Sequence, residues 1–261
     1  MSWRKVSVAG HFGEWLQGRM GPEGPVALVT VACPDLGVSA PGEGAPPFEP
    51  GQLERFARAL GIAPRFPGAS RDAPLGGGAG ASTATLVALA RSAGFDGSAE
   101  ALAAACLAVE GASDPLMYPA PDTLLWASRE GHILRELPPP PACTILGGFW
   151  GPPQRTDAAD NGFDDVSDLV LDWERATRDR DLGRAAALAS ASAGRCAARR
   201  GPQGDPTSGL ARELGALGWL RAHTGSARGL IFAPGAVPRH GAAALAEAGF
   251  AGVLTFGTGA P

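Results

Sequence analysis

Residues 72–85 read Asp72-Ala73-Pro74-Leu75-Gly76-Gly77-Gly78-Ala79-Gly80-Ala81-Ser82-Thr83-Ala84-Thr85, and the apolar run Leu86-Val87-Ala88-Leu89-Ala90 follows directly. The glycines lack a Cβ atom, so backbone N–H groups in such a loop can close around an anion. The apolar run predicts a helix, whose first N–H groups and positive dipole end point back at the same loop. Residues 74–83 therefore predict a phosphate-binding loop, although the same composition also suits a plain hinge before a surface helix.

Two hydroxyl residues, Ser82 and Thr83, stand where this loop turns into the helix. We expect them to cap the helix N–H groups or to offer oxygen ligands to a metal or phosphate. Two familiar nucleotide motifs are excluded. A P-loop requires Lys where this sequence has Ala81. The spacing Gly76-x-Gly78-x-x-Ala81 matches a dinucleotide fingerprint, but the preceding residues 65–71 do not form the buried strand which that motif needs.

Composition narrows the class of protein. The chain has 261 residues, 45% of them hydrophobic, and a net charge of −4, which offers no attractive field to nucleic acid or anionic lipid. The N-terminus lacks the apolar segment of a signal peptide, and no apolar run is long enough to span a membrane. Four widely spaced cysteines suggest neither a zinc site nor a disulfide framework, so we expect a cytoplasmic protein.

The hydrophobic pattern predicts a balanced set of strands and helices, so the class is α/β or α+β. Strands are expected at residues 6–9 (ended by Gly10), 26–32, 124–127, 132–134, 142–146, 229–232 and 252–255. Helices are expected at residues 53–60, from the glycine-rich loop to about 92, and at 99–109, 164–177, 181–198, 209–220 and 242–248. Pro138 to Pro141 form a stiff spacer, which is the best candidate for a boundary between two lobes.

Three separated stretches resemble one family. The pattern from Pro74 to Ala84 resembles the central ATP-phosphate motif of the GHMP kinases. Residues 9–14, Ala-Gly-His-Phe-Gly-Glu, resemble their N-terminal motif, and residues 222–230 resemble their C-terminal glycine-containing motif. The matches occur in the family's order and span nearly the whole chain. They imply the α+β two-lobed GHMP kinase fold, with a ribosomal-S5-domain-2-like N-terminal ATP-binding lobe at 1–140 and a ferredoxin-like C-terminal lobe at 141–261.

Within that superfamily the sequence is most similar to the L-threonine kinase branch of cobalamin biosynthesis. The resemblance rests on Gly13-Glu14-Trp15-Leu16-Gln17-Gly18, on residues 110–119 and on the run Ala222-His223-Thr224-Gly225-Ser226. Three features depart from the family pattern. Ala9 replaces Pro, Ala79 and Ala81 replace Leu and Ser, and one extra residue separates Glu110 from Asp114. None of these changes removes the Ser82 hydroxyl.

The resemblance assigns roles to particular residues. ATP phosphates would bind the loop of Pro74, Gly76, Gly77, Gly78, Ala79, Gly80, Ala81, Ser82 and Thr83, and Mg²⁺ would bind Ser82 and Glu110. Asp114 would act on the acceptor hydroxyl as base or orienting group, with His11, which stands where some relatives have Lys, as a second catalytic residue. The acceptor would contact Glu14, Gln17, His223, Thr224, Gly225 and Ser226. Each assignment has a plainer alternative, such as a turn residue for Asp114 or a structural role for His11.

The implied activity is ATP- and Mg²⁺-dependent phosphorylation of L-threonine. Two alternatives stay open: a kinase for another small alcohol such as homoserine, and a nucleotide-binding protein that has lost turnover. The expected partner is a small amino-acid substrate, with no nucleic acid or membrane, and the expected state is a monomer or homodimer.

Overall fold

One antiparallel sheet runs through the computed structural model, which describes residues 3–260. Its strand order is β5-β4-β2-β1-β7-β8-β6-β9, with β3 paired to β2, and every strand pair in this range is antiparallel. The strands are β1 (Val6–Arg19), β2 (Val26–Ala40), β3 (Ser70–Arg71), β4 (Leu124–Ala127), β5 (His132–Glu136), β6 (Cys143–Phe149), β7 (Gly218–Arg221), β8 (Ala227–Phe232) and β9 (Ala251–Thr258). The mixed class expected from the sequence is confirmed.

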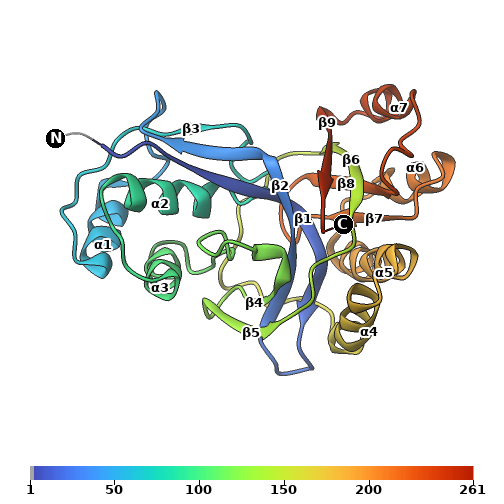
Figure 1. Ribbon diagram of the computed structural model, residues 1–261, viewed down its shortest axis with the longest axis horizontal. Coiled ribbons are helices and arrows are strands. Elements are labelled where there is room, and N and C mark those ends of the chain that lie inside the picture. Colours follow the sequence, from blue (N-terminus) through green and yellow to red (C-terminus); the bar gives the residue numbers. More distant parts are fainter. Residues whose placement is uncertain (1–2, 261) are drawn as a thin grey trace.

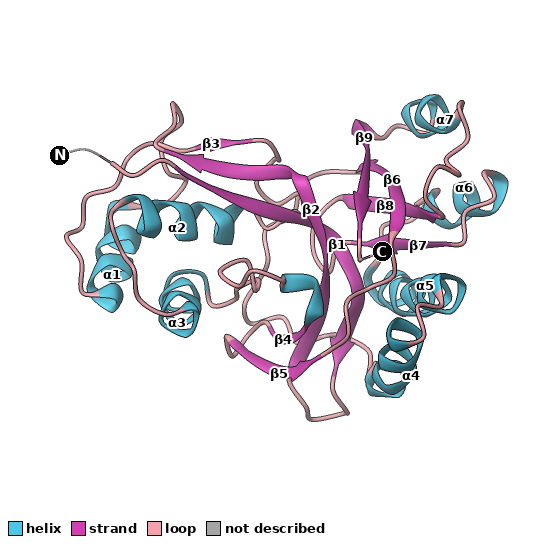
Figure 2. Cartoon of the chain, in the orientation of Figure 1, coloured by secondary structure: helices cyan, strands magenta, loops and turns pink. Residues whose placement is uncertain are grey.

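Helices lie in two groups on either side of the long β1–β2 hairpin (Figures 1 and 2). The first group is α1 (Pro50–Leu60), α2 (Ala81–Ser92) and α3 (Ala99–Glu110). The second is α4 (Ser167–Arg178), α5 (Leu182–Arg200), α6 (Thr207–Glu213) and α7 (Gly241–Glu247). A short 3-10 helix, Pro121–Thr123, precedes β4. None of the helices in residues 3–260 combines the length and apolar character needed to cross a membrane.

The first strand is much longer than its sequence predicts. We expected it to end at Gly10, but β1 continues to Arg19 and pairs with β2 along its length. The pairing shifts register near Gly10 and between His11 and Leu16, and Gly13 has φ +69°, which a glycine adopts without a steric penalty. The polar and glycine residues that read as a loop are therefore bulges within a buried strand, because pairing with β2 outweighs their weak strand propensity.

The helix that follows the glycine-rich loop begins where expected but is capped differently. Gly80 is its N-cap residue, with φ +66° and no side chain to accept a hydrogen bond. Ser82 and Thr83 lie inside the first turn, so the expectation that they cap the helix is wrong. Their hydroxyl groups are consequently free to serve other contacts, which are described below.

A helix expected at residues 209–220 is also shorter than predicted. α6 ends at Glu213, Gly215 turns the chain with φ +69°, and Trp219 and Leu220 belong to β7. These two residues pair with β8, opposite Leu230 and Gly229. The apolar run fits either a helix or a strand, and the pairing available in the sheet decided between them.

The two halves of the chain share one hydrophobic core. Phe12, Trp15 and Leu16 of β1 pack in the same cluster as Trp173 of α4 and residues of α5 and β8. The ring centroids of Trp15 and Trp173 lie 5.5 Å apart. One of the backbone links is Glu14 opposite Arg221, which joins β1 to β7. The lobe boundary near Pro140 remains a prediction, and the shared core places both halves in direct contact.

Candidate active site

A cavity of about 260 Å³ opens between the two halves. The segments around it include the glycine-rich loop with the start of α2, the end of α3 and the loop after it, the middle of β1, the turn after β4, residues 154–156, and the loop between β7 and β8. Most predicted site residues line it, namely His11, Glu14, Pro74, Gly76, Gly78, Ala79, Gly80, Ala81, Ser82, Thr83, Glu110, Asp114, His223 and Thr224. Residues far apart in sequence thus meet at one concave surface.

The glycine-rich loop presents N–H groups to this cavity. Its carbonyl groups are taken by the protein: Gly77 O accepts from Ser226 and Ala227, Gly78 O from Gly13, and Ala79 O from His11, all through backbone N–H donors. A trans peptide directs its N–H opposite to its C=O, so the next N–H groups along the loop face away from these partners. In the described range the N–H groups of residues 78–83 donate to no protein atom. This arrangement suits an anion at the N-terminus of α2.

The loop's glycines are required by neighbouring protein atoms. Gly78 has φ +79°, and a Cβ there would lie 2.2 Å from the Ala222 side chain. Gly80 has φ +66°, and a Cβ there would lie 2.6 Å from His11 Cδ2. Both contacts are far inside ordinary van der Waals distance. The sequence reasoning attributed the glycines to close approach of phosphate, and the structure adds close packing against β1 and the β7–β8 loop.

Ser82 and Glu110 form the oxygen pair that was predicted to hold a metal. The Ser82 hydroxyl donates to the Glu110 carboxylate across the start of α2 and the end of α3. Burial raises the pKa of Glu110 to about 7, and Asp114 adds to the shift, while the Ser82 hydrogen bond and Arg155 oppose it. A bound cation would restore the charged form. Two oxygens fit Mg²⁺, which keeps waters and phosphate oxygens as its other ligands.

No richer metal site competes with this pair. Residues 3–260 hold no cluster of three His, Cys, Asp or Glu side chains placed to bind a metal ion. The four cysteines are all free and buried. Any metal at the cavity would therefore depend on phosphate oxygens for most of its coordination, as Mg²⁺ bound with a nucleotide does.

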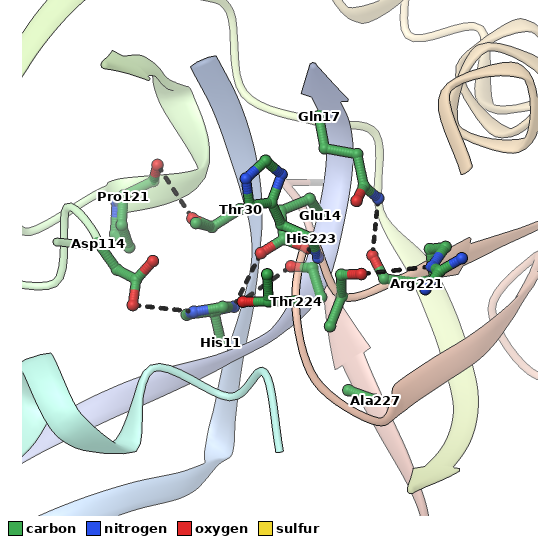
Figure 3. A network of polar contacts seen from close by, with 12 residues as sticks. His11, Glu14, Gln17, Thr30, Asp114, Pro121, Arg221, His223, Thr224 and Ala227 are labelled. Carbon is green, nitrogen blue, oxygen red and sulfur yellow. Dashed lines mark hydrogen bonds and ion pairs between the residues drawn. The ribbon is translucent and has the colours of Figure 1, made fainter. Parts of the chain in front are cut away.

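His11 and Asp114 lie side by side as an ion pair at the cavity wall (Figure 3). His11 Nε2 lies 3.4 Å from Asp114 Oδ2, and His11 Nδ1 lies 3.3 Å from the carbonyl oxygen of Gly13. Burial alone would lower the pKa of His11, but Asp114 and then Glu14 outweigh it and raise the pKa to about 9. His11 is therefore an imidazolium at neutral pH, buried beside a carboxylate that is partly open to the cavity.

Glu14 lies deeper than Asp114 and is tied to the opposite loop. Its Oε2 accepts the backbone N–H of His223 at 2.5 Å, and its Oε1 lies 4.0 Å from His11 Nδ1. Burial raises the pKa of Glu14 to about 8, although His11 opposes the shift. The carboxyl group therefore holds its proton near neutral pH unless a further positive charge enters the cavity.

The loop from Ala222 to Ser226 closes one side of the cavity. His223 is 5% exposed and its ring stacks on Phe163 with centroids 3.8 Å apart. Burial, followed by the charges of Arg129, Arg200 and Arg221, holds the pKa of His223 well below its usual range. The ring is consequently neutral. Arg228 fixes the loop from behind, with its Nη1 donating to Gly225 O at 3.1 Å.

Four predicted residues lie behind the cavity surface and do not line it. Gln17 Nε2 donates to the carbonyl oxygen of Arg221 at 2.9 Å. Gly77, Gly225 and Ser226 join the glycine-rich loop to the β7–β8 loop, because Ser226 N–H donates to Gly77 O and a Cβ on Gly225 would lie 2.6 Å from Gly78 N. These four residues therefore support the cavity wall from behind. Direct contact with a ligand remains a prediction for them.

Several lining residues were missed by sequence reasoning. They are Ser113, Ser128, Arg129 and the segment 154–156. Ser128 and Arg129 follow β4 and read as an ordinary hairpin turn, and residues 154–156 belong to a Pro- and Gly-flanked loop without a motif. Gln154 N–H donates to Gly76 O at 2.8 Å, which lays this loop against the glycine-rich loop. Ser113 lies within residues 110–119, which carry part of the family resemblance, but no local pattern marked the other positions; only the arrangement of the chain brings them together.

Comparison with solved structures identifies the architecture. Phosphomevalonate kinase of Streptococcus pneumoniae aligns with a TM-score of 0.66 at 12% identity, over 98% of this chain and 100% of that chain. Mevalonate kinase of Staphylococcus aureus aligns with a TM-score of 0.62 at 16% identity, over 97% and 98%. Homoserine kinase of Cytophaga hutchinsonii aligns with a TM-score of 0.58 at 15% identity, over 97% and 94%. The chain has the GHMP kinase fold.

The GHMP kinase fold extends over essentially the whole length of both partners in these alignments. Neither known sequence families nor the sequences of curated proteins match this chain. The likeness is therefore one of architecture, and the assignment of activity rests on the residues in the cavity.

Proposed function

We propose that the chain is an ATP- and Mg²⁺-dependent kinase that phosphorylates the side-chain hydroxyl of L-threonine. The product would be O-phospho-L-threonine, for the aminopropanol linker of cobalamin. One observation carries the kinase proposal: the open N–H groups of the glycine-rich loop, the Ser82–Glu110 pair and the His11–Asp114 pair all border a single cavity. Phosphoryl transfer needs those three elements, which bind phosphate, neutralise charge and orient the nucleophile.

In this proposal the N–H groups of residues 78–83 hold the ATP phosphates, and Ser82 and Glu110 hold Mg²⁺. The ion supplies neutralisation of the phosphate charge when it is bound. The Asp114 carboxylate accepts or orients the acceptor hydroxyl. The His11 imidazolium, 3.4 Å from Asp114, holds that carboxylate in position.

The L-threonine assignment rests on the sequence resemblance of residues 13–18 and 222–226, and the cavity supplies suitable groups. Glu14 is a buried carboxyl that lines the cavity, and its pKa is raised to about 8 mainly by burial although His11 opposes the shift, so a substrate ammonium group in the cavity would favour its charged form. Thr224 also lines the cavity and lies in the same loop as His223. A small amino acid with a hydroxyl group is the partner that these groups fit.

A coupled ADP-release assay tests the proposal with L-threonine, L-serine and L-homoserine as acceptors. We expect L-threonine to be preferred, with L-serine slower by about 10- to 200-fold, the range of discrimination for one methyl group. Preference for L-homoserine would overturn the threonine assignment and leave the kinase standing. That alternative has its own support, because homoserine kinases of two organisms align with this chain at TM-scores of 0.58 and 0.59.

A nucleotide-binding protein without turnover is the alternative from another class. The position of Asp114 beside His11 in the cavity argues against it, because a binding protein has no need of a carboxylate near the phosphate site. ATP binding measured by calorimetry, with no ADP release on any hydroxyl compound, would favour this alternative.

A further inference from the structure

Polar atoms without partners gather on the wall of the cavity beside Asp114. Ser113 Oγ, Ser128 Oγ, Arg129 Nε and both ring nitrogens of His223 have no hydrogen-bond partner among the described residues. Ser113 and Ser128 are each 3% exposed, and His223 is 5% exposed. All four side chains line the cavity. Buried polar groups in folded proteins are normally paired, so this wall has the character of a binding surface that lacks its ligand.

The fold holds these residues next to the reacting side of the cavity. Ser113 N–H donates to the Ser128 carbonyl oxygen at 2.9 Å, which joins the loop after α3 to the turn after β4. Asp114 and Arg129 are the next residues along each segment. Arg129 Nη2 donates to the Asp157 carbonyl oxygen at 3.2 Å, so one edge of the guanidinium is anchored while Nε stays unpartnered.

Two arginines line the cavity, Arg129 and Arg155. Asp114 and then Arg155 act on the pKa of Glu110, whereas Arg129 is the first charge that lowers the pKa of His223. The neutral His223 ring, held against Phe163, can donate one hydrogen bond and accept another. Because the Ser113–Ser128 hydrogen bond joins the two segments, the Arg129 guanidinium and the two hydroxyl groups lie on the wall that carries Asp114, the residue proposed to act on the acceptor.

We propose that Arg129, together with the hydroxyl groups of Ser113 and Ser128, binds a carboxylate group of the acceptor. The acceptor is thus a hydroxylated amino acid or hydroxy acid, and an alcohol without a carboxylate is a poor substrate. A guanidinium offers planar paired donors that match a carboxylate, and hydroxyl donors complete its hydrogen bonding. This inference rests on the proposed kinase function and narrows its substrate class.

Two acceptor pairs test the inference: L-threonine with 1-amino-2-propanol, and L-homoserine with 3-amino-1-propanol. Each pair differs by the carboxylate alone. We expect Arg129→Gln to lower kcat/KM for the preferred acid by roughly 10²-fold, mainly through KM, because a charge-assisted hydrogen bond is lost. Activity on the matching amino alcohol should stay within about twofold, and so should the KM for ATP. Arg129→Lys should restore part of the loss, because it returns the charge without the paired donors.

Arg135→Gln is the matched control. Arg135 lies on the same hairpin, in β5, but its side chain pairs with Glu174 at 3.0 Å on the surface. This variant should leave every kinetic constant near the wild-type value. Thermal unfolding of each variant confirms that the fold is kept.

The outcomes separate the inference from the proposed function. If Arg129→Gln lowers kcat/KM equally for the acid and for its amino alcohol, the carboxylate assignment is wrong and the proposed kinase function stands. The same holds if the variant raises only the KM for ATP, a result that would place the transferred phosphate at Arg129. If no acceptor releases ADP, the proposed function fails, and calorimetric titration of L-threonine and L-homoserine decides the inference. Binding that Arg129→Gln abolishes supports it, and absent or unchanged binding overturns it.

Discussion

Asp114 and His11 form a close pair, in which the positive charge of His11 depends on the neighbouring carboxylate. Asp114 is partly open to the cavity, whereas His11 is buried behind it at 3.4 Å. A buried imidazole loses its charge unless a carboxylate compensates for the lost hydration. Asp114 provides that compensation, and in return it gains a fixed positive neighbour. The pair therefore works as one unit, although its members are more than 100 positions apart in the chain.

The first prediction concerns Asp114. We expect Asp114→Asn to lower kcat by about 10²-fold or more, the scale of an acid–base or orienting group, and to keep the affinity for ATP. The measurements are steady-state kinetics and nucleotide titration. Asp96→Asn is the control, because Asp96 pairs with Arg4 on the surface. A near wild-type rate in Asp114→Asn would make Asp114 an ordinary turn residue.

The second prediction concerns the pH dependence of stability. The pKa of His11 is raised to about 9 in the folded protein, mainly because Asp114 outweighs the opposing effect of burial. Its stabilising contribution is therefore complete below its unfolded pKa of about 6.5 and is lost as the pH rises through about 9.

Urea unfolding of the wild type and of His11→Gln between pH 6 and 10 measures this effect. The advantage of the wild type in unfolding free energy should shrink with rising pH, by up to about 3 kcal/mol. Glu14 also faces His11, and its own pKa is raised to about 8 by burial while His11 opposes the rise, so the pH-dependent difference reports on the coupled His11–Glu14 pair. A difference that stays constant over this range would show that His11 is not charged when folded.

At the scale of single elements, the glycine-rich loop and α2 act together. The loop's carbonyl groups are bound by β1 and the β7–β8 loop, and this fixes the direction of the N–H groups at the helix N-terminus. Gly80 is the junction, where a left-handed backbone conformation starts α2. A side chain at Gly80 would press on His11 and so disturb two parts of the site together.

The third prediction separates backbone strain from this contact. Gly80→Ala should weaken ATP binding strongly, and Gly80→Val more so, because the new Cβ lies 2.5 Å from Leu116 Cδ1 and 2.6 Å from His11 Cδ2. Gly61→Ala is the matched control: Gly61 also has φ +66°, but a Cβ there has no atom within 4 Å. The control should lose about 1–2 kcal/mol of stability from the left-handed backbone and keep its ATP affinity. Unchanged ATP affinity in a folded Gly80→Ala protein would contradict the phosphate-binding loop.

At the scale of the whole molecule, β1 connects the two halves. Its residues pack with α4, α5 and β8 in one core, while its bulged middle section carries His11 and Glu14 into the cavity. The geometry of the site therefore depends on the same strand that joins the halves. Loss of packing behind β1 should therefore disturb both the site and the contact between the two halves.

The fourth prediction tests this connection. Trp15 is 1% exposed and packs against Trp173, so Trp15→Ala should reduce the unfolding free energy by about 3–5 kcal/mol. Both halves should still unfold in a single transition, so the far- and near-ultraviolet circular dichroism signals should change together. Leu171→Ala is the control, since Leu171 on α4 is 54% exposed and should be nearly neutral. Two separate transitions in either protein would show that the halves unfold independently.

Local sequence signals were sufficient for the elements with strong local causes. The glycine-rich loop followed by an apolar run fixed the start of α2, and the apolar periodicity with a closing Gly111 fixed α3. Most motif residues of this loop, together with His11, Glu14, Glu110 and Asp114, line one cavity, and the family resemblance covered all of these stretches. Their roles in a site stay predictions.

The tertiary structure determined what depends on contacts between distant residues. β1 continued through Gly10 and Gly13 because β2 offered pairing, and residues 219–220 became a strand because β8 lay beside them. The meeting of Ser113, Ser128, Arg129 and His223 has no signature in any one segment. The raised pKa of His11 likewise requires a carboxylate brought from elsewhere in the chain. Sequence sets local backbone preferences, whereas burial and long-range pairing decide which charges and unpaired polar atoms face one another.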